Sequence, residues 1–271
     1  MARVVTIVQA RLGSQRLPGK VLAPVAGRRV LDWQLTRMRA SRLAGTIIVA
    51  IPVGQRDDTL ANHCAALGFA CFRGHEDDVL DRHYRAACEY DADVVVKVPS
   101  DCPLIDPAVI DRVIGRFLEM PDAFDYVSNL HPATYPDGND VEVMSMASLE
   151  TAWREADRRF EREHTTPFIW ERPQRFRLGN VVWDNGRDLS MSHRFTLDYP
   201  ADLTFVRAVF ERLAPRNPLF SLQDILSLLE RLPCLLDLNA AFAGVNWYRH
   251  HLRELQTIDA SATRFPEEST T

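Results

Sequence analysis

The chain has 271 residues, 46% of them hydrophobic and 25% charged, which fits one large α/β domain or a catalytic domain with a modest appendage and excludes disordered, collagenous and coiled-coil proteins. Its five cysteines, an odd number without CxxC spacing, argue against a disulfide framework or a structural zinc site. The net charge of −5 disfavours nucleic-acid binding, and no apolar run approaches the roughly 20 residues that span a bilayer, so we expect a cytoplasmic protein without nucleic-acid or membrane partners.

Short apolar runs alternate with amphipathic stretches over the first 118 residues. The run Val4 to Val8 is β-branched and lacks polar alternation, as expected for a parallel strand buried on both faces. Strands are expected at residues 4–8, 46–51, 70–72 and 94–98, and helices at residues 30–40, 57–67, 77–90 and 108–118. This alternation predicts an α/β fold with a mostly parallel, Rossmann-like sheet, helices on both faces and right-handed crossovers.

The pattern changes after residue 124, where short strands alternate with loops and helices. Strands are expected at residues 124–127, 140–144 and 176–183, and helices at residues 147–159 and 162–170, so this section should form a smaller antiparallel extension. The segment RFTLD, residues 194–198, is expected to return to the main sheet before a helix at residues 201–213.

The C-terminal part begins after the linker prolines Pro215 and Pro218. We expect a main domain over residues 1–215, a helical appendage over residues 216–258 with helices at 222–231 and 240–255, and a disordered tail over residues 259–271. This appendage could serve as an oligomer contact or as a docking pair of helices.

The loop RLGSQRLPGK, residues 11–20, directly follows the first expected strand. It is neither GxxxxGKS nor GxGxxG, so neither a Walker loop nor a dinucleotide-binding turn is supported. Residues 1–31 carry six cations and no acid, while the other 240 residues carry a net −11, which suits a compact anionic ligand. We interpret the loop as a phosphate site; the alternative is a solvated basic loop. Its glycines permit close backbone approach, and its cations and hydroxyl suit phosphate oxygens: Arg11, Gly13, Ser14, Arg16 and Lys20.

Lysine usage marks two positions within this chain. Of the 32 basic residues only Lys20 and Lys97 are lysine, so both are candidates for positions that need a compact ammonium.

Two aspartates are expected at the carboxyl ends of strands. Asp101 follows the strand at 94–98, and Asp198 ends RFTLD. A carboxylate there could hold Mg²⁺ against phosphate oxygens, or it could cap a helix or turn. Cys102, beside Asp101, has no paired histidine in the sequence pattern, so a buried thiol is favoured over a nucleophile.

A series of motifs between Arg3 and Leu213 resembles one enzyme family. In order they are IVQARLGSQRLPGKVL, DDVLDRHYRAA, SDCPLIDP, DYVSN, TYPDGNDVEV, EREHTTPF, LGNV and FTLDYPADL. This sequence resembles the spore-coat-polysaccharide-type cytidylyltransferases, relatives of the CMP-sialic acid and CMP-Kdo synthetases. The resemblance implies a nucleotidyltransferase fold, Mg²⁺ as cofactor and a homodimer, with CTP and an acidic sugar giving a CMP-sugar and pyrophosphate by direct attack of a sugar hydroxyl on the α-phosphate.

The resemblance also implies roles for particular residues. The basic loop would hold the CTP triphosphate through Arg11, Gly13, Ser14, Arg16 and Lys20, and Asp81 and Arg82 would lie near the base and ribose. Lys20, Asp101 and Asp198 would be catalytic, the two aspartates as Mg²⁺ ligands. The section from about 124 to 190 would hold the acceptor, through Asp140, Glu142, Glu163 and His164, and could also form a dimer contact. His164 could deprotonate the acceptor hydroxyl, bind its carboxylate, or only join segments by hydrogen bonds.

Two other functions stay open at this point. A glycosyltransferase on a similar sheet would use a nucleotide-sugar, although the cationic loop favours a triphosphate. A nucleotide-binding scaffold without turnover would be supported only by Ser100, which stands where relatives commonly have glycine. Thermal-shift measurements with CTP and with nucleotide-sugars separate the three functions.

Overall fold

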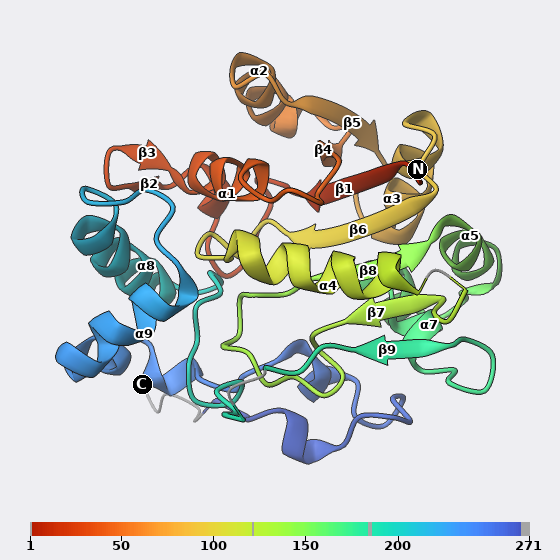
Figure 1. Ribbon diagram of the computed structural model, residues 1–271. Coiled ribbons are helices and arrows are strands. Elements are labelled where there is room, and N and C mark those ends of the chain that lie inside the picture. Colours follow the sequence, from red (N-terminus) through yellow and green to blue (C-terminus); the bar gives the residue numbers. More distant parts are fainter. Residues whose placement is uncertain (1, 121, 184–185, 267–271) are drawn as a thin grey trace.

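The expected apolar runs form the centre of a seven-stranded sheet in the computed structural model, which describes residues 2–120, 122–183 and 186–266 (Figure 1). Its order is β5-β4-β1-β6-β8-β7-β9. The strands, in chain order, are β1 (Val4–Gln9), β4 (Thr46–Pro52), β5 (Ala70–Gly74), β6 (Val94–Pro99), β7 (Tyr126–Ser128), β8 (Glu142–Ser145) and β9 (Leu178–Asn180), and a separate two-stranded ribbon joins β2 (Pro24–Val25) to β3 (Arg28–Arg29).

The sheet is mostly parallel, as predicted. β5, β4, β1 and β6 pair in parallel, β8 runs antiparallel between β6 and β7, and β9 pairs in parallel with β7. The expected antiparallel extension is therefore the other half of the same sheet. Because β8 is the strand that reverses direction, the residues on both sides of it belong to one continuous surface.

Helices cover both faces of the sheet, which confirms the prediction. Along β6 the side chains of Val94, Val96 and Val98 join one core, and Val95 joins the other. The α-helices are α1 (Val30–Arg39), α2 (Asp58–Ala66), α3 (Val79–Glu89), α4 (Pro107–Glu119), α5 (Met146–Glu155), α6 (Arg159–His164), α7 (Pro167–Trp170), α8 (Pro200–Leu213) and α9 (Leu222–Arg231). None of the helices in the described ranges is both long and apolar enough to cross a membrane.

The helix expected over residues 162–170 is two helices. Thr165 ends α6 with φ at +76°, and Pro167 starts α7. A proline at the first position of a helix has no N–H to pair and its fixed φ suits the new start, so the break falls between His164 and Pro167. The last residues of α6, Glu163 and His164, line the cavity described below.

The segment Arg194 to Asp198 is not a strand of the main sheet, so that expectation is wrong. Phe195 and Leu197 are buried in the core, and this alternation with polar residues imitates a strand. Their N–H groups donate to loop carbonyls, those of Asp137 and Asp101. Gly138 allows the approach, because a Cβ there would lie 2.5 Å from the Thr196 nitrogen.

The expected C-terminal helix over residues 240–255 is also wrong. Gly244 has φ at +73°, and a Cβ there would lie 2.8 Å from the Met191 side chain, so this position breaks a helix. Short 3-10 turns take its place, and another covers part of the expected disordered tail; residues 267–271 of that tail lie outside the described residues. The 3-10 turns of the chain are η1 (Lys20–Leu22), η2 (Gln55–Asp57), η3 (Pro233–Leu238), η4 (Ala240–Phe242), η5 (Trp247–His250) and η6 (Ala260–Ala262).

Candidate active site

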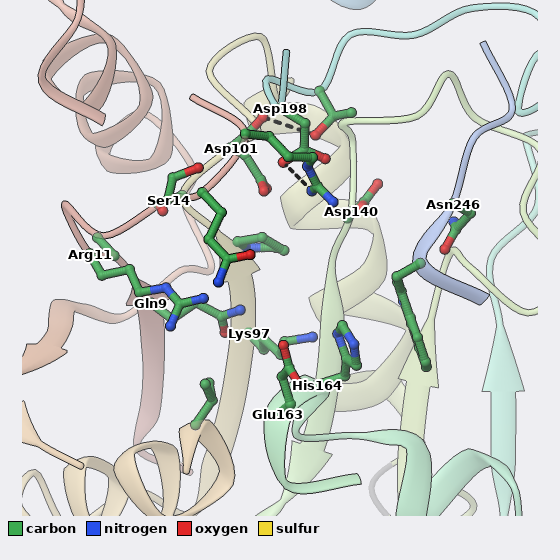
Figure 2. Close-up of a pocket in the computed structure, with 18 of the residues that line it drawn as sticks. Gln9, Arg11, Ser14, Lys97, Asp101, Asp140, Glu163, His164, Asp198 and Asn246 are labelled. Atoms are coloured by element: carbon green, nitrogen blue, oxygen red, sulfur yellow. Dashed lines mark hydrogen bonds and ion pairs between the residues drawn. The ribbon is translucent and has the colours of Figure 1, made fainter. Parts of the chain in front are cut away.

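A cavity of about 900 Å³ opens at the carboxyl ends of β1 and β6 (Figure 2). Ligands of open α/β sheets bind at this edge, where the strands point their following loops toward one another. Figure 2 places Arg11 and Ser14 of the basic loop on one side of the cavity and Asn246 on the opposite side. The cavity is lined by parts of the loops after β1, β5 and β6 and of the segments 137–142, 159–164, 194–199 and 245–251.

Lys20 occupies the centre of the charged end of this cavity. Its Nζ lies 3.0 Å from Asp101 Oδ2 and 2.9 Å from Asp198 Oδ1, and it donates to the Leu197 carbonyl at 2.8 Å. Burial would lower the pKa of Lys20, but the two carboxylates outweigh it and raise the pKa above its usual value. The ammonium is thus charged at any physiological pH, and it joins two loops that are far apart in the chain.

Asp198 is surrounded by three cations. Arg16 lies 2.7 Å from Oδ1, the same oxygen that contacts Lys20, and Arg194 lies 3.4 Å from Oδ2. Burial would raise the pKa of Asp198, but Lys20 and Arg16 lower it far below its usual range. Of these three cations, Arg16 is the one whose side chain is partly exposed, at 44%. Its guanidinium can therefore contact an anion in the cavity.

Two further aspartates crowd the same corner. Burial and the neighbouring Asp101 raise the pKa of Asp140 to about 6, and burial and Asp140 raise the pKa of Asp137 well above its usual range. Negative charge is therefore incompletely compensated here, and hard divalent cations bind carboxylate oxygens. The described residues hold no group of three or more His, Cys, Asp or Glu side chains arranged for a metal. An ion at Asp101 and Asp198 would thus take its remaining ligands from water and phosphate, as Mg²⁺ commonly does.

The rest of the basic loop is only partly directed into the cavity. Arg11 and Ser14 line it, and Arg11 lies 4.0 Å from Asp77. Gly13 is not among the lining residues; its backbone passes Arg56, whose guanidinium would lie 2.6 Å from a Cβ at this position. Gly13 therefore allows the backbone of the loop to pass close to Arg56, and it does not contribute to the cavity lining.

Asp81 and Arg82 of α3 have different surroundings. Asp81 does not line the cavity, because its carboxylate accepts hydrogen bonds from Arg85 and from Trp153 Nε1. Arg82 does line it, but its guanidinium donates to the carbonyls of His75 and Glu76. Arg82 thus holds the loop after β5 in place at the cavity edge.

Lys97, the second lysine, also pairs with a carboxylate in the cavity. Its Nζ lies 2.5 Å from Glu142 Oε1, and Tyr126 donates to Glu142 Oε2 at 2.7 Å. Burial would raise the pKa of Glu142, but Lys97 lowers it below its usual range. Glu142 is thus a fixed, ionised partner of Lys97.

His164 and Glu163 end α6 at the far side of the cavity. The His164 ring stacks on Trp247, with centroids 3.8 Å apart. Burial and Lys97 lower the pKa of His164 to about 3, so the ring is neutral and cannot attract a carboxylate by charge. Glu163 is 44% exposed and has a distant partner, Arg159 at 3.9 Å, so its carboxylate can reach a ligand.

Cys102 and Ser100 flank Asp101 in the sequence. Cys102 is fully buried and burial raises its pKa, which confirms a buried thiol. Ser100 is not among the described residues with positive φ, so it fits a position where glycine is common without strain.

Sequence reasoning missed two parts of the site. The side chain of Arg194 is 1% exposed and forms ion pairs with Asp137, Asp198 and Asp202. The sequence feature that could have indicated this role is an arginine directly before the apolar positions of RFTLD. The second part is the segment 245–251, which lines the cavity. The sequence analysis expected a helix over residues 240–255 and assigned no site residue to it.

Comparison with known proteins gives consistent relatives. A profile described as Cytidylyltransferase matches residues 5–236. The spore coat polysaccharide biosynthesis protein SpsF of Bacillus subtilis is 30% identical over 238 residues, 86% of this chain and 96% of that protein. A 3-deoxy-manno-octulosonate cytidylyltransferase of Geobacter sulfurreducens is 35% identical over 123 residues, which cover 44% of this chain and 46% of that enzyme. A solved cytidylyltransferase of Leptospira borgpetersenii superposes with a TM-score of 0.83 at 27% identity, covering 87% of this chain and 97% of that one.

Proposed function

The chain belongs to the cytidylyltransferase family, and on that premise we propose that it transfers CMP from CTP to a hydroxyl of an acidic sugar, of nonulosonic-acid type or related to it, with release of pyrophosphate. The cofactor in this proposal is Mg²⁺. A relative named for 3-deoxy-manno-octulosonate, a sugar acid, supports an acceptor of this class.

The observation that carries the proposal is the position of Lys20 between Asp101 and Asp198, with Arg16 on the same oxygen of Asp198. This arrangement combines a fixed ammonium, a partly exposed guanidinium and two carboxylates at one end of the cavity. Cations at this point can bind the phosphates of CTP, while the carboxylates can hold a metal ion against the same phosphates.

The reaction forms one P–O bond and breaks another. The acceptor hydroxyl oxygen bonds to the α-phosphorus, the bond to the β-phosphate breaks, and pyrophosphate leaves. Lys20 and Arg16 would neutralise the charge that develops on the leaving group, and Asp140, which lines the cavity, would accept the hydroxyl proton. When bound, Mg²⁺ would supply further neutralisation of the phosphate oxygens.

Pyrophosphate release with CTP, UTP or ATP and Mg²⁺ tests the proposal on the full chain. The acceptors are a panel of acidic sugars, each compared with its methyl ester. We expect release with CTP and an acid. Preference for UTP or ATP would contradict the cytidylyl assignment. A thermal shift with nucleotide-sugars but not with CTP would favour a glycosyltransferase, and binding of CTP without any release would favour an inactive scaffold.

The expected homodimer and cytoplasmic location stay predictions from the sequence. Light scattering during gel filtration tests the homodimer, because the measured mass should then be twice the 30.8 kDa of one chain.

A further inference from the structure

The segment from Asn239 to Arg264 forms one side of the cavity. It lies beyond residue 236, where the family match ends. Residues 245–251 nonetheless line the cavity, opposite the basic loop, as the position of Asn246 in Figure 2 shows. The chain thus completes its cavity with a part that the family match does not include.

Two aromatic stacks and one arginine fix this segment to the site. Phe242 stacks on Tyr199 with centroids 3.9 Å apart, and Trp247 stacks on His164 at 3.8 Å. Arg194 donates to the Val245 carbonyl at 3.2 Å. The three residues that hold the segment, Tyr199, His164 and Arg194, themselves line the cavity. The position of residues 245–251 is therefore fixed by contacts within the cavity wall.

The far side of the segment is also held. The N–H of Arg264 donates to the Gly244 carbonyl at 2.7 Å, and the N–H of Asn246 donates to Thr263 Oγ1 at 3.0 Å. Tyr248 and Leu255 are buried in the core on one face of the sheet. The segment is therefore a packed wall, able to hold side chains in defined positions.

Arg249 is the arginine of this wall that lines the cavity. Its guanidinium donates to the Asn246 carbonyl at 2.6 Å and contacts Tyr199 Oη at 3.5 Å, and no carboxylate among the described residues pairs with it. In contrast, Arg16, Arg162 and Arg194, which line the same cavity, each pair with an aspartate. Arg82 also lacks a carboxylate partner in the described ranges, but it is fully buried and its guanidinium donates to the loop carbonyls of His75 and Glu76. A partly buried arginine with donors in a cavity and no acidic partner suits a carboxylate that arrives with a ligand.

We propose that residues 246–251 form the acceptor-binding wall of the site and that Arg249 binds the carboxylate of the acceptor. The inference rests on the proposed function and adds the group that selects acidic over neutral sugars. His164 cannot supply this selection because its ring is neutral, and Arg16 faces Asp198 on the opposite side. Trp247, fixed by His164, supplies an apolar surface against which a sugar ring can pack.

The test measures binding to the full chain by calorimetry. The protein is first saturated with Mg²⁺ and a CTP analogue whose α,β-bridging oxygen is a methylene, so that no turnover occurs. The probes are 3-deoxy-manno-octulosonate and N-acetylneuraminate, each paired with its methyl ester. The variants are Arg249→Gln and, as matched control, Arg253→Gln, since Arg253 is exposed and does not line the cavity.

We expect wild type and R253Q to bind at least one acid about tenfold or more tightly than its ester, as a charge-assisted hydrogen bond predicts. R249Q should lose that ratio while its affinity for the CTP analogue and its melting temperature stay unchanged. Arg249→Lys should restore part of the ratio.

Three outcomes would overturn the inference: an unchanged ratio in R249Q, no discrimination between acid and ester in wild type, or weaker binding of the CTP analogue in R249Q, which would assign Arg249 to the triphosphate. Failure of wild type to bind the CTP analogue would instead overturn the proposed function. The first binding step therefore separates the two failures.

Discussion

The two sides of the cavity are built in different ways. The side proposed to bind the nucleotide, here called the nucleotide side and formed by residues 11–20, 99–101 and 194–198, holds its charges in pairs, with Lys20 between Asp101 and Asp198. The side proposed to bind the acceptor, here called the acceptor side and formed by residues 159–164 and 245–251, contains the stacked rings of His164 and Trp247 and the cavity-lining side chains of Arg249 and Glu163. The first side is arranged for a ligand of high charge, and the second for a ligand that must be oriented and recognised.

The largest expected effect comes from the nucleotide side. Lys20→Ala removes a point charge that faces the phosphates and should cost about 2 to 4 kcal/mol in the transition state. Pyrophosphate release should therefore fall roughly 30- to 1,000-fold in kcat/KM. The control is Arg42→Ala, which removes a cation whose side chain is 89% exposed, outside the cavity. Wild-type kinetics in K20A would remove the basic loop from the mechanism.

The metal candidates should give the next largest effect. Asp101→Asn and Asp198→Asn each remove one charged ligand and should shift the Mg²⁺ concentration for half-maximal activity about 10- to 100-fold. The double variant should lose little more than the worse single one, because on the proposed function both residues would hold one ion. Titration of activity with Mg²⁺ measures this. Additive losses would mean that the two carboxylates serve separate roles.

Acid should lower the stability of the fold through its buried neutral histidines, one of them His164 of the acceptor side, before it protonates Asp198 of the nucleotide side. Burial lowers the pKa of His131 to about 4 and of His164 to about 3, below the value of about 6.5 in an unfolded chain. Below pH 6.5 the unfolded chain therefore binds protons that the folded chain does not, and the free energy of unfolding falls by about 1.4 kcal/mol per pH unit for each such histidine. The lowered pKa of Asp198 affects the free energy of unfolding only in stronger acid, at pH values below the usual pKa of an aspartate.

Urea denaturation at pH 7.5 and 5.5 measures this difference, with His164→Gln as the variant. H164Q should reduce the loss of stability between the two pH values by about 1.4 kcal/mol. His75→Gln is the matched control, since His75 is exposed. An equal pH dependence in H164Q and wild type would contradict a neutral buried ring at position 164.

The smallest expected effect concerns the acceptor. Glu163→Gln and His164→Ala should each raise the KM for the acceptor about fivefold, the cost of roughly one hydrogen bond or ring contact of about 1 kcal/mol. Calorimetric titration with CTP should give unchanged affinity in both. Weakened CTP binding with unchanged acceptor kinetics would place these residues on the nucleotide side.

The sequence could predict the nucleotide side because its residues follow regular elements. Lys20 lies in the loop after β1 and Asp101 in the loop after β6, and buried parallel strands are visible as apolar runs. Both strand ends then fall at one edge of the sheet. The expected strand RFTLD and the motif FTLDYPADL both indicate Asp198, although the segment that carries it is not a strand of the sheet.

The acceptor side could not be predicted in the same way. Its elements are irregular, and their positions depend on contacts between distant segments, such as Trp247 on His164 and Val245 on Arg194. Local periodicity suggested helices over 162–170 and 240–255, and it does not report the breaks at Thr165 and Gly244 that aim the flanking residues at the cavity. The neutral state of His164 also depends on burial by the C-terminal segment.

Arg194 links segments of the chain that are synthesised at different times. Its guanidinium holds Asp137, Asp198 and Asp202, and its partners further along the chain, the Val245 carbonyl directly and Asn239 through the backbone, are synthesised later. A growing chain on the ribosome can therefore assemble its sheet and the pairs around Lys20 while the opposite wall is still missing. On the proposed function, we expect such a growing chain to bind CTP before it can bind an acceptor.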